Sequence, residues 1–586
     1  MVYPYSPEFT ERLKRVLPIT WDPKNKVWGF SFSDWGAVYT HFHLMNIPYT
    51  VSTRFQEAEQ AYRDVRARHR RAVLEWKAAP EKLDIKGLWP HQQEGAAFLL
   101  KFPRAALFDE MGLGKTRQVL TVMKQRFSRG DIHKALILCP ATHFPIWRQE
   151  IEEYAPEFVP FLVLFRGLKD SRLNAFAQAA EETFLVGVAN YEMLAIPHYI
   201  EALGKIPFDL IVADEIHRVG NPTAKRTKSF FQLFSTPKAK YRIALTGTPI
   251  RNSPLDAWTI LKWLDPEGVE NFYHFRSNYA VFREKRVPGK KPVQFIVGYQ
   301  NLTELEDRLS IISLRRRKED VMPFLPPIVF QRYAVEMREE QAELYDEWSD
   351  RVAGEITAGL ASGDMNRHQV LEKIVRLAQI ADSPFLVDES YPMVSGKAAF
   401  LLEMLPAWKE SHNQIVVWCR FVGMLRALQE SLSTLKLGRV GLVYGEVSQT
   451  KREKIIQDFR SGKISLLVAN PQVAGEGFSF PEASLQVFFD NSFSYNVRKQ
   501  AIHRLHRGTT THTVFVVDLV SEKTIDEYIL LALSRKDFLA KLLVDGEVKG
   551  SVFDGISLSK LVKIIKREEN QRISGQLGLI RERGDD

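Results

Sequence analysis

The chain has few cysteines and no long apolar run, and each shortage excludes a class of protein. Cys139 and Cys419 are the two cysteines among 586 residues, and they lie in separate apolar runs. A disulfide framework needs more cysteines and a zinc site needs more ligands, so we expect two buried thiols in a reducing compartment. The longest apolar runs, such as VFVVDLV at 514–520, have the length of a strand and are far too short to span a membrane.

The first residues, MVYPYSPEFTERLKRVL, contain no basic segment followed by an apolar core, so we expect no secretory signal. Internal repeats and low-complexity tracts are also missing. With 45% hydrophobic and 26% charged residues, the composition is that of an ordinary globular protein with several cores.

Positive charge is in excess. The net charge is +9 and the isoelectric point is near 9.2, which favours a polyanionic partner without identifying it. The excess is spread along the chain, and its densest run is RARHRR at 66–71. A solvated helix face explains this run better than a phosphate contact does.

The stretch FDEMGLGKT at 108–116 is close to a phosphate-binding loop. An apolar run precedes it and a helical pattern follows it, which is the context that such a loop requires. Backbone N–H groups around Gly112 and Gly114 would surround the β-phosphate, Lys115 would neutralise β and γ charge, and Thr116 would bind Mg²⁺. Asp109, however, stands where the common pattern has its first glycine.

An apolar strand that ends in acids would complete the site, and FDLIVADEIH at 208–217 supplies it. Asp214 follows the apolar run, at the end of a strand where α/β sheets bind ligands. We expect Asp214 to hold Mg²⁺ through its waters and Glu215 to orient and deprotonate the attacking water. The two motifs in this order favour an ATP site over a surface turn.

DEMGLGKT followed by DEIHRVGN resembles the Swi/Snf-type ATPases of helicase superfamily two, whose loop also begins with an acid. The resemblance implies an α/β fold with two RecA-like parallel-sheet lobes, a helical insertion and a small N-terminal α+β domain. It also implies ATP and Mg²⁺ as cofactors. The departure at Asp109 is therefore a mark of the family.

Further segments resemble the family's motifs. LWPHQQEGAAFLL at 88–100 places Gln92 where a glutamine reads adenine, with His91 in place of a tyrosine. ALILCPATHFPIWRQEI at 135–151 resembles the segment that grips one DNA strand. In ALTGTPIRNS at 244–253, Thr246 and Thr248 would couple hydrolysis to strand contact. NFYHFRSNYA and LRRRKEDVMPFLPP match signatures beyond the first lobe, and the arginines 315–317 fit either salt bridges or DNA contacts.

The second lobe would supply arginines. ISLLVANPQVAGEGFSF at 464–480 resembles a motif that holds strand and nucleotide, and Gly475 and Gly477 would allow close approach. QAIHRLHRG at 500–508 fits the family pattern through Gln500, Arg504 and Arg507. If this stretch is helical, the two arginines share a face and can point toward the γ-phosphate.

The resemblance assigns catalytic roles to Lys115, Asp214, Glu215, Gln500, Arg504 and Arg507, and metal binding to Thr116 and Asp214. The residues expected to bind nucleotide are Gln92, Asp109, Glu110, Met111, Gly112, Leu113, Gly114, Lys115, Thr116, Gly475 and Gly477. The chain departs from the family pattern at two places beside Arg504 and Arg507, and these leave the local loop geometry open. His503 stands in place of an aspartate, and Gly508 with the threonines after it stands in place of the family's usual residues after the last arginine. The histidines 503, 506 and 512 could suggest a metal, but a metal there would repel the neighbouring arginines.

The matched segments predict five regions. They are a small N-terminal domain at 1–80, a first RecA-like lobe at 81–266, a helical insertion and linker at 267–395, a second lobe at 396–545, and a helical tail at 546–586. Within 1–80, PEFTERLKRVL suggests a helix and ITWDPKNKVWGFSF suggests two short strands. Trp21, Asp22 and Trp28 give this region a small similarity to the annealing-helicase (HepA-related) branch, and an ordinary α+β cap fits equally well.

The leading hypothesis is a DNA-stimulated ATPase that translocates on double-stranded DNA without separating strands. The alternatives are a strand-separating DNA or RNA helicase, a fork-remodelling enzyme that acts on branched DNA, an RNA-dependent ATPase, and a nucleic-acid-binding scaffold with a degenerate ATP site. No wedge hairpin is visible in the sequence. We expect no membrane partner and a cytoplasmic location in a bacterial or phage-infected cell, or the nucleus if the chain is eukaryotic; protein partners stay unknown.

Overall fold

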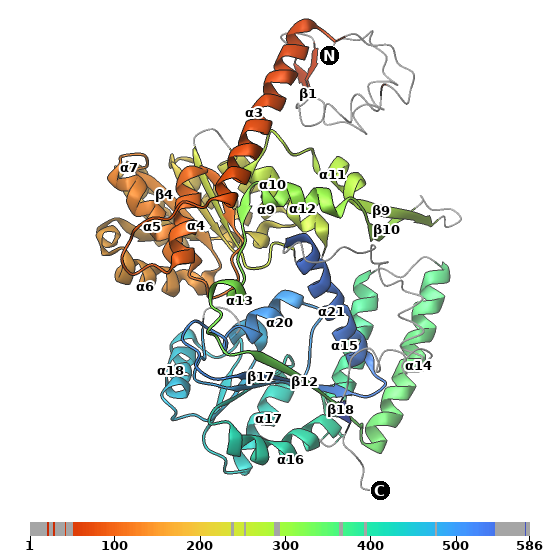
Figure 1. Cartoon of the computed structure of the whole chain (residues 1–586). Helices are drawn as coiled ribbons and strands as arrows, with labels where there is room; N and C mark the ends of the chain where they lie inside the picture. The colour runs from red at the N-terminus through yellow and green to blue at the C-terminus, as the bar shows by residue number, and fades with distance from the viewer. Residues whose placement is uncertain are drawn as a thin grey trace. The chain divides into compact units, whose positions relative to one another are not determined.

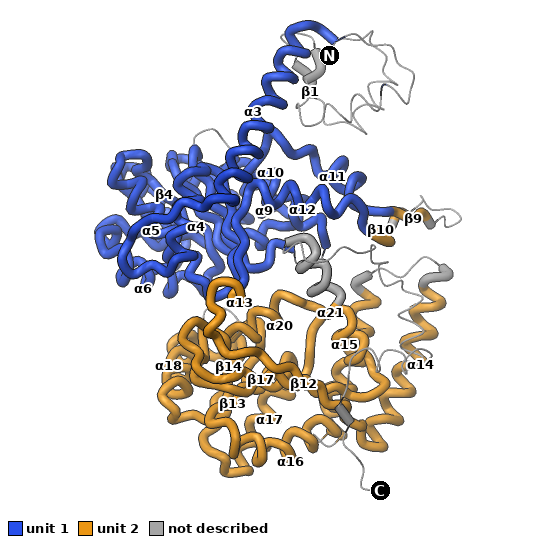
Figure 2. Tube along the Cα trace, in the orientation of Figure 1, with its two compact units in different colours: residues 1–281, 299–317, 540–552 blue, residues 282–298, 318–539, 553–586 orange. Residues whose placement is uncertain are grey.

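The computed structural model describes residues 20–22, 27–29, 42, 51–235, 239–250, 253–285, 293–362, 367–391, 395–474, 478–544 and 580–581. The chain divides into two compact units (Figure 2). The first takes in residues 1–281, 299–317 and 540–552, and the second 282–298, 318–539 and 553–586. Each unit is built around its own parallel sheet (Figure 1).

The first unit contains a seven-stranded sheet in the order β11-β3-β8-β7-β4-β6-β5, and all neighbouring strands pair in parallel. The strands are β3 (Arg104–Leu107), β4 (Lys134–Cys139), β5 (Leu162–Leu164), β6 (Leu185–Asn190), β7 (Leu210–Asp214), β8 (Tyr241–Leu245) and β11 (Ser313–Leu314). Every residue of β4, β7 and β8 is buried, as expected for parallel strands covered on both faces.

The helices of the first unit are α3 (Thr53–Ala78), α4 (Pro90–Lys101), α5 (Lys115–Ser128), α6 (Phe144–Tyr154), α7 (Lys169–Glu181), α8 (Pro197–Gly204), α9 (Lys225–Phe234), α10 (Ala257–Leu264), α11 (Phe272–Tyr279) and α12 (Leu302–Ser310). The end of α3, with α4, α5 and α6, buries apolar residues against alternate residues of the strands, such as Ala135 and Ile137 of β4. This doubly covered sheet is the architecture that the sequence predicted.

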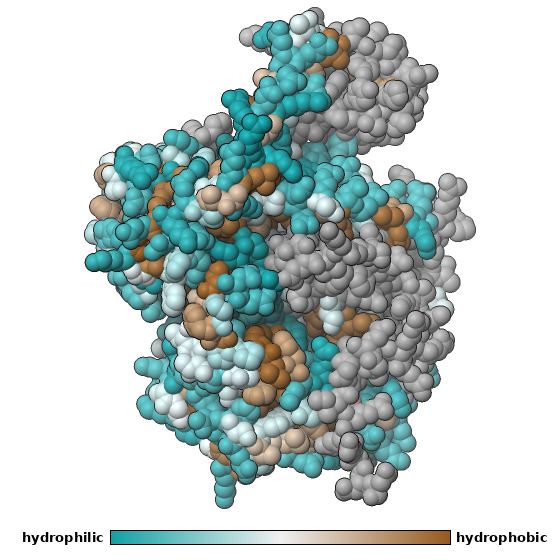
Figure 3. Space-filling view, in the orientation of Figure 1, coloured by the Kyte–Doolittle hydropathy of each residue, from teal (hydrophilic) through white to brown (hydrophobic). Residues whose placement is uncertain are grey.

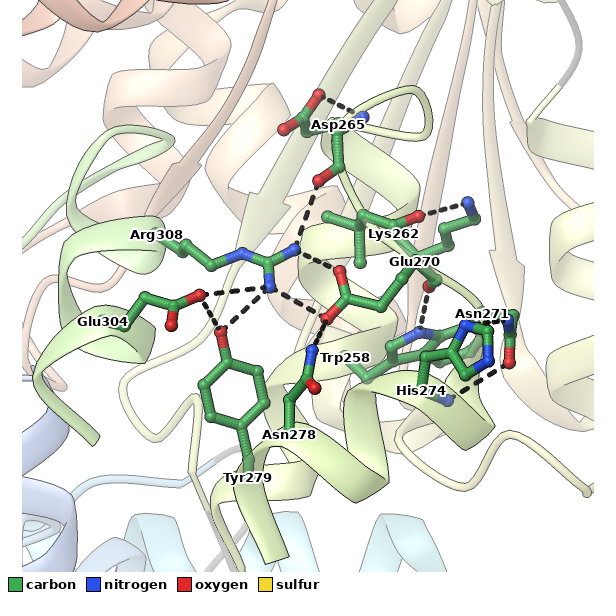
Figure 4. A network of polar contacts seen from close by, with 12 residues as sticks. Trp258, Lys262, Asp265, Glu270, Asn271, His274, Asn278, Tyr279, Glu304 and Arg308 are labelled. Carbon is green, nitrogen blue, oxygen red and sulfur yellow. Dashed lines mark hydrogen bonds and ion pairs between the residues drawn. The ribbon is translucent and has the colours of Figure 1, made fainter. Parts of the chain in front are cut away.

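A polar network fastens the segment after α10 to the rest of the first unit (Figure 4). Arg308 of α12 forms a bidentate ion pair with Glu270, with distances of 2.7 Å to Oε2 and 3.0 Å to Oε1. The same guanidinium donates to the hydroxyl of Tyr279, which itself donates to Glu304. Residues 271–280, which match a family signature, thus belong to this unit and are held by a largely buried cation.

The second unit contains a seven-stranded parallel sheet in the order β14-β15-β13-β16-β17-β12-β18. Its strands are β12 (Ile328–Val335), β13 (Ile415–Trp418), β14 (Val440–Val443), β15 (Leu466–Ala469), β16 (Leu485–Phe488), β17 (Val514–Ser521) and β18 (Ile580–Arg581). β13, β15 and β16 are buried throughout, because helices cover both of their faces.

Helices lie on both faces of this second sheet. Buried residues of α16 and α17 form one core with alternate strand residues, and α18, α19 and α20 contribute to the other. The helices from residue 318 onward are α13 (Lys318–Val321), α14 (Glu339–Ser362), α15 (Arg367–Asp382), α16 (Gly396–Ser411), α17 (Val422–Thr434), α18 (Gln449–Arg460), α19 (Pro471–Ala474), α20 (Tyr495–Ile502) and α21 (Ile525–Val544).

The region 267–395 contains the helices α11 to α15, as its sequence suggested, and also strands that the sequence did not suggest. Besides helices it contains β11, which joins the first sheet, and β12, which joins the second. It also contains the strands β9 (Ala280–Lys285) and β10 (Val293–Tyr299), which form a two-stranded sheet of their own. The segment is therefore shared between the two units, and the strands were missed because they are short or half-exposed.

Few of the expectations for the two ends fall on described residues. β1 (Thr20–Asp22) and β2 (Val27–Gly29) pair antiparallel with Trp21 opposite Trp28, which confirms the two predicted strands. The expected helix in PEFTERLKRVL and the expected tail helix in LSKLVKIIKREE lie outside the described residues. Ile580–Arg581 of the tail forms β18.

The basic run RARHRR lies on α3, and two of its arginines make ion pairs within the first unit. Arg66 contacts Asp265 at 2.6 Å and Arg70 contacts Asp307 at 3.2 Å. Hydrophilic residues predominate on the described surface drawn in Figure 3, with hydrophobic residues scattered among them. Among the described residues, no helix has the length and apolar character needed to cross a bilayer.

A buried lysine joins three elements of the second unit. Lys397 at the start of α16 is fully buried, and its ammonium contacts Asp382 at the end of α15 and Asp526 in α21, at 2.7 and 2.5 Å. It also donates to the carbonyl of Phe489. Removing one partner of such a cluster leaves charge buried without compensation.

We therefore predict that Lys397→Met destabilises the second unit by about 3–5 kcal/mol, because Asp382 and Asp526 would face each other without the cation. Urea unfolding followed by circular dichroism measures the loss. Lys451→Met, which changes an exposed lysine of α18, is the control and should stay within about 0.5 kcal/mol of the parent. Equal stability of the two variants would contradict the prediction.

Candidate active site

The phosphate-loop segment connects β3 to α5, as predicted. Gly112 and Gly114 have φ angles of 90° and 74°, in the left-handed region that glycine tolerates without steric cost. At Gly114 a Cβ atom would also lie 2.2 Å from the side-chain nitrogen of Gln92. The loop therefore requires glycine at position 114 for two independent reasons, and α5 begins directly after it.

Lys115 lies at the N-terminus of α5 and folds back over the loop. Its ammonium donates to the carbonyls of Asp109 and Glu110 at 2.7 and 3.3 Å. Burial lowers the pKa of Lys115, while the nearby carboxylates of Glu215, Asp109 and Asp214 act in the opposite direction. The loop and the acids that follow β7 thus form one electrostatic cluster, and Thr116 lies beside Lys115 as the second residue of the helix.

The structure explains why an aspartate occupies position 109. Asp109 is fully buried, and its carboxylate forms a bidentate ion pair with Arg316, with Nε–Oδ1 and Nη2–Oδ2 distances of 3.0 and 2.5 Å. Gln118 donates to the same carboxylate at 3.1 Å and accepts from Arg316 at 2.9 Å. Arg316 is thus a salt-bridge residue, one of the two roles the sequence left open, and the Asp109 side chain stabilises the base of the loop.

The segment that precedes the loop in sequence also braces it. His91 and Gln92 of α4 both contact the carbonyl of Leu113, at 3.1 and 3.3 Å. The side-chain oxygen of Gln92, Oε1, accepts a hydrogen bond from the backbone N–H of Trp89. Burial lowers the pKa of His91, so the ring contacts the loop in its neutral form near pH 7. Met111 and Leu113 are buried, and Glu110 bonds through its backbone to Arg316.

Asp214 is the last residue of β7. His143 Nδ1 and the Trp147 indole both lie 3.0 Å from its Oδ2 atom, and the Tyr191 hydroxyl donates to its backbone carbonyl at 2.8 Å. Oδ1 carries neither of these contacts. The carboxylate is therefore held in one orientation by residues of the segment 135–151, which the sequence had assigned to strand contact.

Glu215 adopts a left-handed backbone conformation, with φ of 51°, that turns its side chain toward Thr246 and His217. Its Oε2 accepts from the Thr246 hydroxyl at 3.1 Å and lies 3.1 Å from His217 Nδ1. Burial raises the pKa of Glu215, but the charge and hydrogen bond of His217, with the charge of Lys115, more than offset this and hold it below its usual range. Glu215 is consequently a carboxylate at neutral pH.

Thr246 links the acids to the segment after β8. Its hydroxyl contacts Glu215 and His217, and it accepts from the backbone N–H of Thr248 at 3.1 Å. Both threonines are buried. Thr246 thus connects the acid pair to the motif at 244–253 by hydrogen bonds, and Arg251 and Asn252 of that motif lie outside the described residues.

Arg504 and Arg507 of the second unit are not on a helix. The prediction that they share one helix face assumed a helical stretch and is therefore wrong. α20 includes Gln500 but ends at Ile502, and Arg504 and Arg507 lie in the turns that follow. The Arg504 carbonyl accepts from Phe480 N–H, and its guanidinium donates to the Phe478 carbonyl at 2.8 Å. These two bonds hold the chain beside residues 478–480 and end the helix.

Thr510 supplies the local geometry that the departure from the family pattern had left open. Its hydroxyl accepts from the Arg507 backbone N–H at 2.9 Å and donates to the Leu505 carbonyl at 2.7 Å. The arginine turn, residues 503–510, is therefore closed by a threonine. Gly475 and Gly477 lie outside the described residues.

Two of the three histidines considered from the sequence, His506 and His512, contact backbone carbonyls. His506 contacts the Pro326 carbonyl at 2.8 Å, and His512 contacts that of Ala483 at 3.1 Å. Among the described residues, no group of three or more His, Cys, Asp or Glu side chains could hold a metal ion.

Several site residues could not be found from sequence. Gln118 and His217 occupy ordinary helical and turn positions in the sequence, and His143 and Trp147 were noted only within a longer motif. The one available signal is spacing, because positions 143 and 147 are four apart and would share a helix face. Nothing in the sequence pairs Arg316 with Asp109 across 207 positions.

Two parallel sheets with helices on both faces, the first bearing a glycine-rich loop at its edge, define a RecA-like α/β protein of two lobes. The family model of the SNF2-related domain matches residues 91–386, and that of the helicase conserved C-terminal domain matches residues 396–509. The chain belongs to the SNF2-related (Swi/Snf-type) family of helicase superfamily two.

Curated relatives are longer than this chain. An "Uncharacterized ATP-dependent helicase" of Mycoplasma genitalium is 25% identical over 489 residues, which are 82% of this chain and 44% of that protein. A "Putative ATP-dependent helicase/translocase" of Bacillus subtilis is 24% identical over 474 residues, 78% of this chain and 49% of that protein. The chain thus spans less than half the length of each of these two relatives.

A solved structure is also similar. The Sulfolobus solfataricus SWI2/SNF2 ATPase core in complex with double-stranded DNA is 24% identical, and the match covers 83% of this chain and 98% of that one, with a TM-score of 0.37.

The packing at Gly95 gives a test of the loop base. A Cβ atom at position 95 of α4 would lie 1.7 Å from Gln118 Oε1 and 2.6 Å from Arg316 Nη2. Gly95→Ala should displace both side chains from Asp109, at a cost of about 1–3 kcal/mol for overpacking. We expect the affinity for a fluorescent ATP analogue, measured by titration, to fall about tenfold, which corresponds to roughly 1.4 kcal/mol.

The matched control is Gly354→Ala in α14, where a Cβ atom would have no neighbour within 4 Å. It should leave the affinity unchanged. Parent-like affinity in Gly95→Ala would contradict the proposed dependence of the loop on this packing.

Proposed function

We propose that the chain hydrolyses ATP and uses the reaction to translocate on double-stranded DNA. The observation that supports this best is the cluster in which the partly buried Lys115 of the phosphate loop lies within electrostatic reach of Asp214 and Glu215. Asp214 ends β7, Glu215 follows it, and Lys115 lies after β3, so all three are at the carboxyl ends of parallel strands, where α/β sheets bind their ligands. A structural salt bridge would not require the left-handed glycines or the strained backbone of Glu215.

The chain's own residues would divide the work as follows. Lys115 exchanges its bonds to the loop carbonyls for bonds to β- and γ-phosphate oxygens. Glu215, ionised and oriented by Thr246, accepts a hydrogen bond and then a proton from the attacking water. The loop N–H groups and the N-terminus of α5 face the phosphates.

A magnesium ion fits the donor set of the first unit. Thr116 and Asp214 offer hydroxyl and carboxylate oxygens, the hard ligands that Mg²⁺ prefers. The Asp214 carboxylate is already oriented, because His143 and Trp147 contact only its Oδ2 atom. When bound, Mg²⁺ would supply positive charge to the β- and γ-phosphates.

Gln500, Arg504 and Arg507 would act from the second unit. The Arg504 and Arg507 guanidiniums would stabilise charge on the γ-phosphoryl group in the transition state, which makes hydrolysis depend on both lobes. Their placement on a turn closed by Thr510, rather than on a helix, supports a segment that can adjust when nucleotide binds.

Two features support a nucleic acid as the polymer, and double-stranded DNA is the form we propose. The net charge is +9, and the Bacillus subtilis relative is named a helicase/translocase. Strand separation is not part of the proposal. Action on forks or branched DNA would require the N-terminal region, which contains the paired strands β1 and β2. Deleting residues 1–50, which keeps helix α3 and its core residues Val73 and Trp76, should then abolish fork regression while it spares plain translocation.

The first test is hydrolysis with different nucleic acids. We expect duplex DNA to raise the ATPase rate at least tenfold over the rate of the protein alone, and more than RNA or single strands do. Phosphate release measured at constant salt checks this, since binding to any nucleic acid is salt-dependent. Equal rates with and without duplex would refute translocation, and a Glu215→Gln protein as active as the parent would refute the acid's role.

The second test concerns the arginine turn. Arg507→Ala should lower kcat by about 10³–10⁵, as loss of an arginine finger does in related phosphoryl-transfer enzymes. Arg460→Ala removes an exposed arginine that lies 3.4 Å from Glu482 in the same unit and should change little, because surface pairs contribute about 0–1 kcal/mol. Similar kcat values for the two variants would show that Arg507 does not act on the phosphate.

A further inference from the structure

The segment that leaves the first unit continues the sheet into the phosphate loop. The carbonyls of Ile312, Leu314 and Arg316 accept in turn from the backbone N–H groups of Ala106, Phe108 and Glu110, at 2.8, 2.9 and 3.0 Å. Residues 312–316 are therefore bonded at every second residue to β3 and to the start of the loop. Any displacement of Arg316 must move residue 110 or break these bonds.

The side chain of Arg316 strengthens this attachment. It is largely buried, forms the bidentate ion pair with Asp109 and donates to the His91 carbonyl and to Gln118. The neighbouring Arg315 donates to the carbonyls of Phe108 and Gly247. Removing one partner of a buried pair of this kind is strongly destabilising, because it leaves a buried charge uncompensated, so Arg316 is a firm anchor in the first unit.

Lys318, two positions later, is anchored in the second unit. It is buried, and its ammonium donates to the His506 carbonyl and to His503 Nδ1 at 2.5 and 3.2 Å. His503 and His506 alternate with Arg504 and Arg507 along the chain. The His506 ring in turn contacts the Pro326 carbonyl, which follows α13. Lys318 is thus attached to the backbone of the arginine turn itself.

The covalent chain then sets a limit that holds however the two units are placed. Two residues of extended chain reach at most about 7 Å between the Cα atoms of Arg316 and Lys318. The base of the phosphate loop and the arginine turn are therefore tied to points that cannot move farther apart than this. We propose that residues 315–318, here called the strap, act as positioning residues that keep the arginine turn in register with the phosphate loop.

This inference rests on the proposed hydrolysis and adds a second requirement to it. A misplacement of about 1 Å can lower a rate by about 10² when it disturbs the reacting geometry. A strap of fixed length confines the arginines to a short range of positions, and it can carry a movement of the loop to residues 503–507. The alternative is that Arg316 and Lys318 only stabilise their own units.

A length change separates the two explanations. Inserting two glycines between Arg317 and Lys318 keeps both anchors but doubles the maximum reach to about 14 Å. We expect kcat to fall at least 100-fold, while the affinity for a fluorescent ATP analogue stays within about threefold, because the loop and its Arg316 anchor are intact. The same insertion after Gly462, in the exposed turn between α18 and β15, is the control and should leave kcat unchanged.

Point variants address the second anchor. Lys318→Met removes the donor and should lower kcat at least tenfold without changing nucleotide affinity. His503→Asp keeps an acceptor for Lys318 and should retain most of the activity. Circular dichroism shows whether each variant is folded. If Lys318→Met and the insertion variant both keep the parent's kcat, the proposal that residues 315–318 position the arginine turn is wrong.

A readout that needs no turnover completes the experiment. Hydrogen exchange with a non-hydrolysable ATP analogue should change in the parent at residues 108–118 and at 495–510. In the insertion variant the change at 108–118 should persist and that at 495–510 should disappear. If the parent binds the analogue but does not hydrolyse ATP, the proposed function fails and this exchange still decides the strap: coupled changes in the insertion variant overturn it.

Discussion

The ion pair between Asp109 and Arg316 is the interaction on which the first unit's site depends. It is buried, it is bidentate, and it joins the start of the phosphate loop to a residue 207 positions later. Gln118 and the carbonyl of His91 complete the contacts of the guanidinium. The ion pair and the side chains of α4 consequently hold the loop in place, and the loop glycines contribute only their backbone conformation.

The acids that face the loop are held in a comparable way. Asp214 is oriented by an imidazole and an indole from one short segment, and Glu215 by a threonine from another. The two segments are different connections at the carboxyl end of the same sheet, one after β4 and one after β8. A parallel sheet makes this possible, because all its strands deliver their following loops to one edge. The second unit repeats the sheet but presents its arginines on a turn.

Much of this fold could be predicted from sequence, and the reason is the continuous apolar character of strands such as LIVAD and IVVW, which are buried on both faces. β12 could not be recognised, because only Ala334 and Val335 of its eight residues are buried. Its pattern is neither that of a strand buried on both faces nor the alternating pattern of a half-buried strand. The glycines and Lys115 followed from local spacing. The roles of Gln118, Trp147 and Arg316 depend on contacts between distant segments, and the end of α20 depends on hydrogen bonds to residues 478–480, which no local pattern reveals.

The lack of a side chain at Gly95 has a consequence for how this sequence can change over time. Gly95, Asp109, Gln118 and Arg316 interlock so closely that a substitution at any one alters what the other three can be. With glycine at position 109, Arg316 and Gln118 would both lose the carboxylate that they contact, and the packing that now requires glycine at position 95 would change with them. Among related chains, the residues at positions 95, 109, 118 and 316 should therefore change together or stay the same together, because the packing constrains all four as one set.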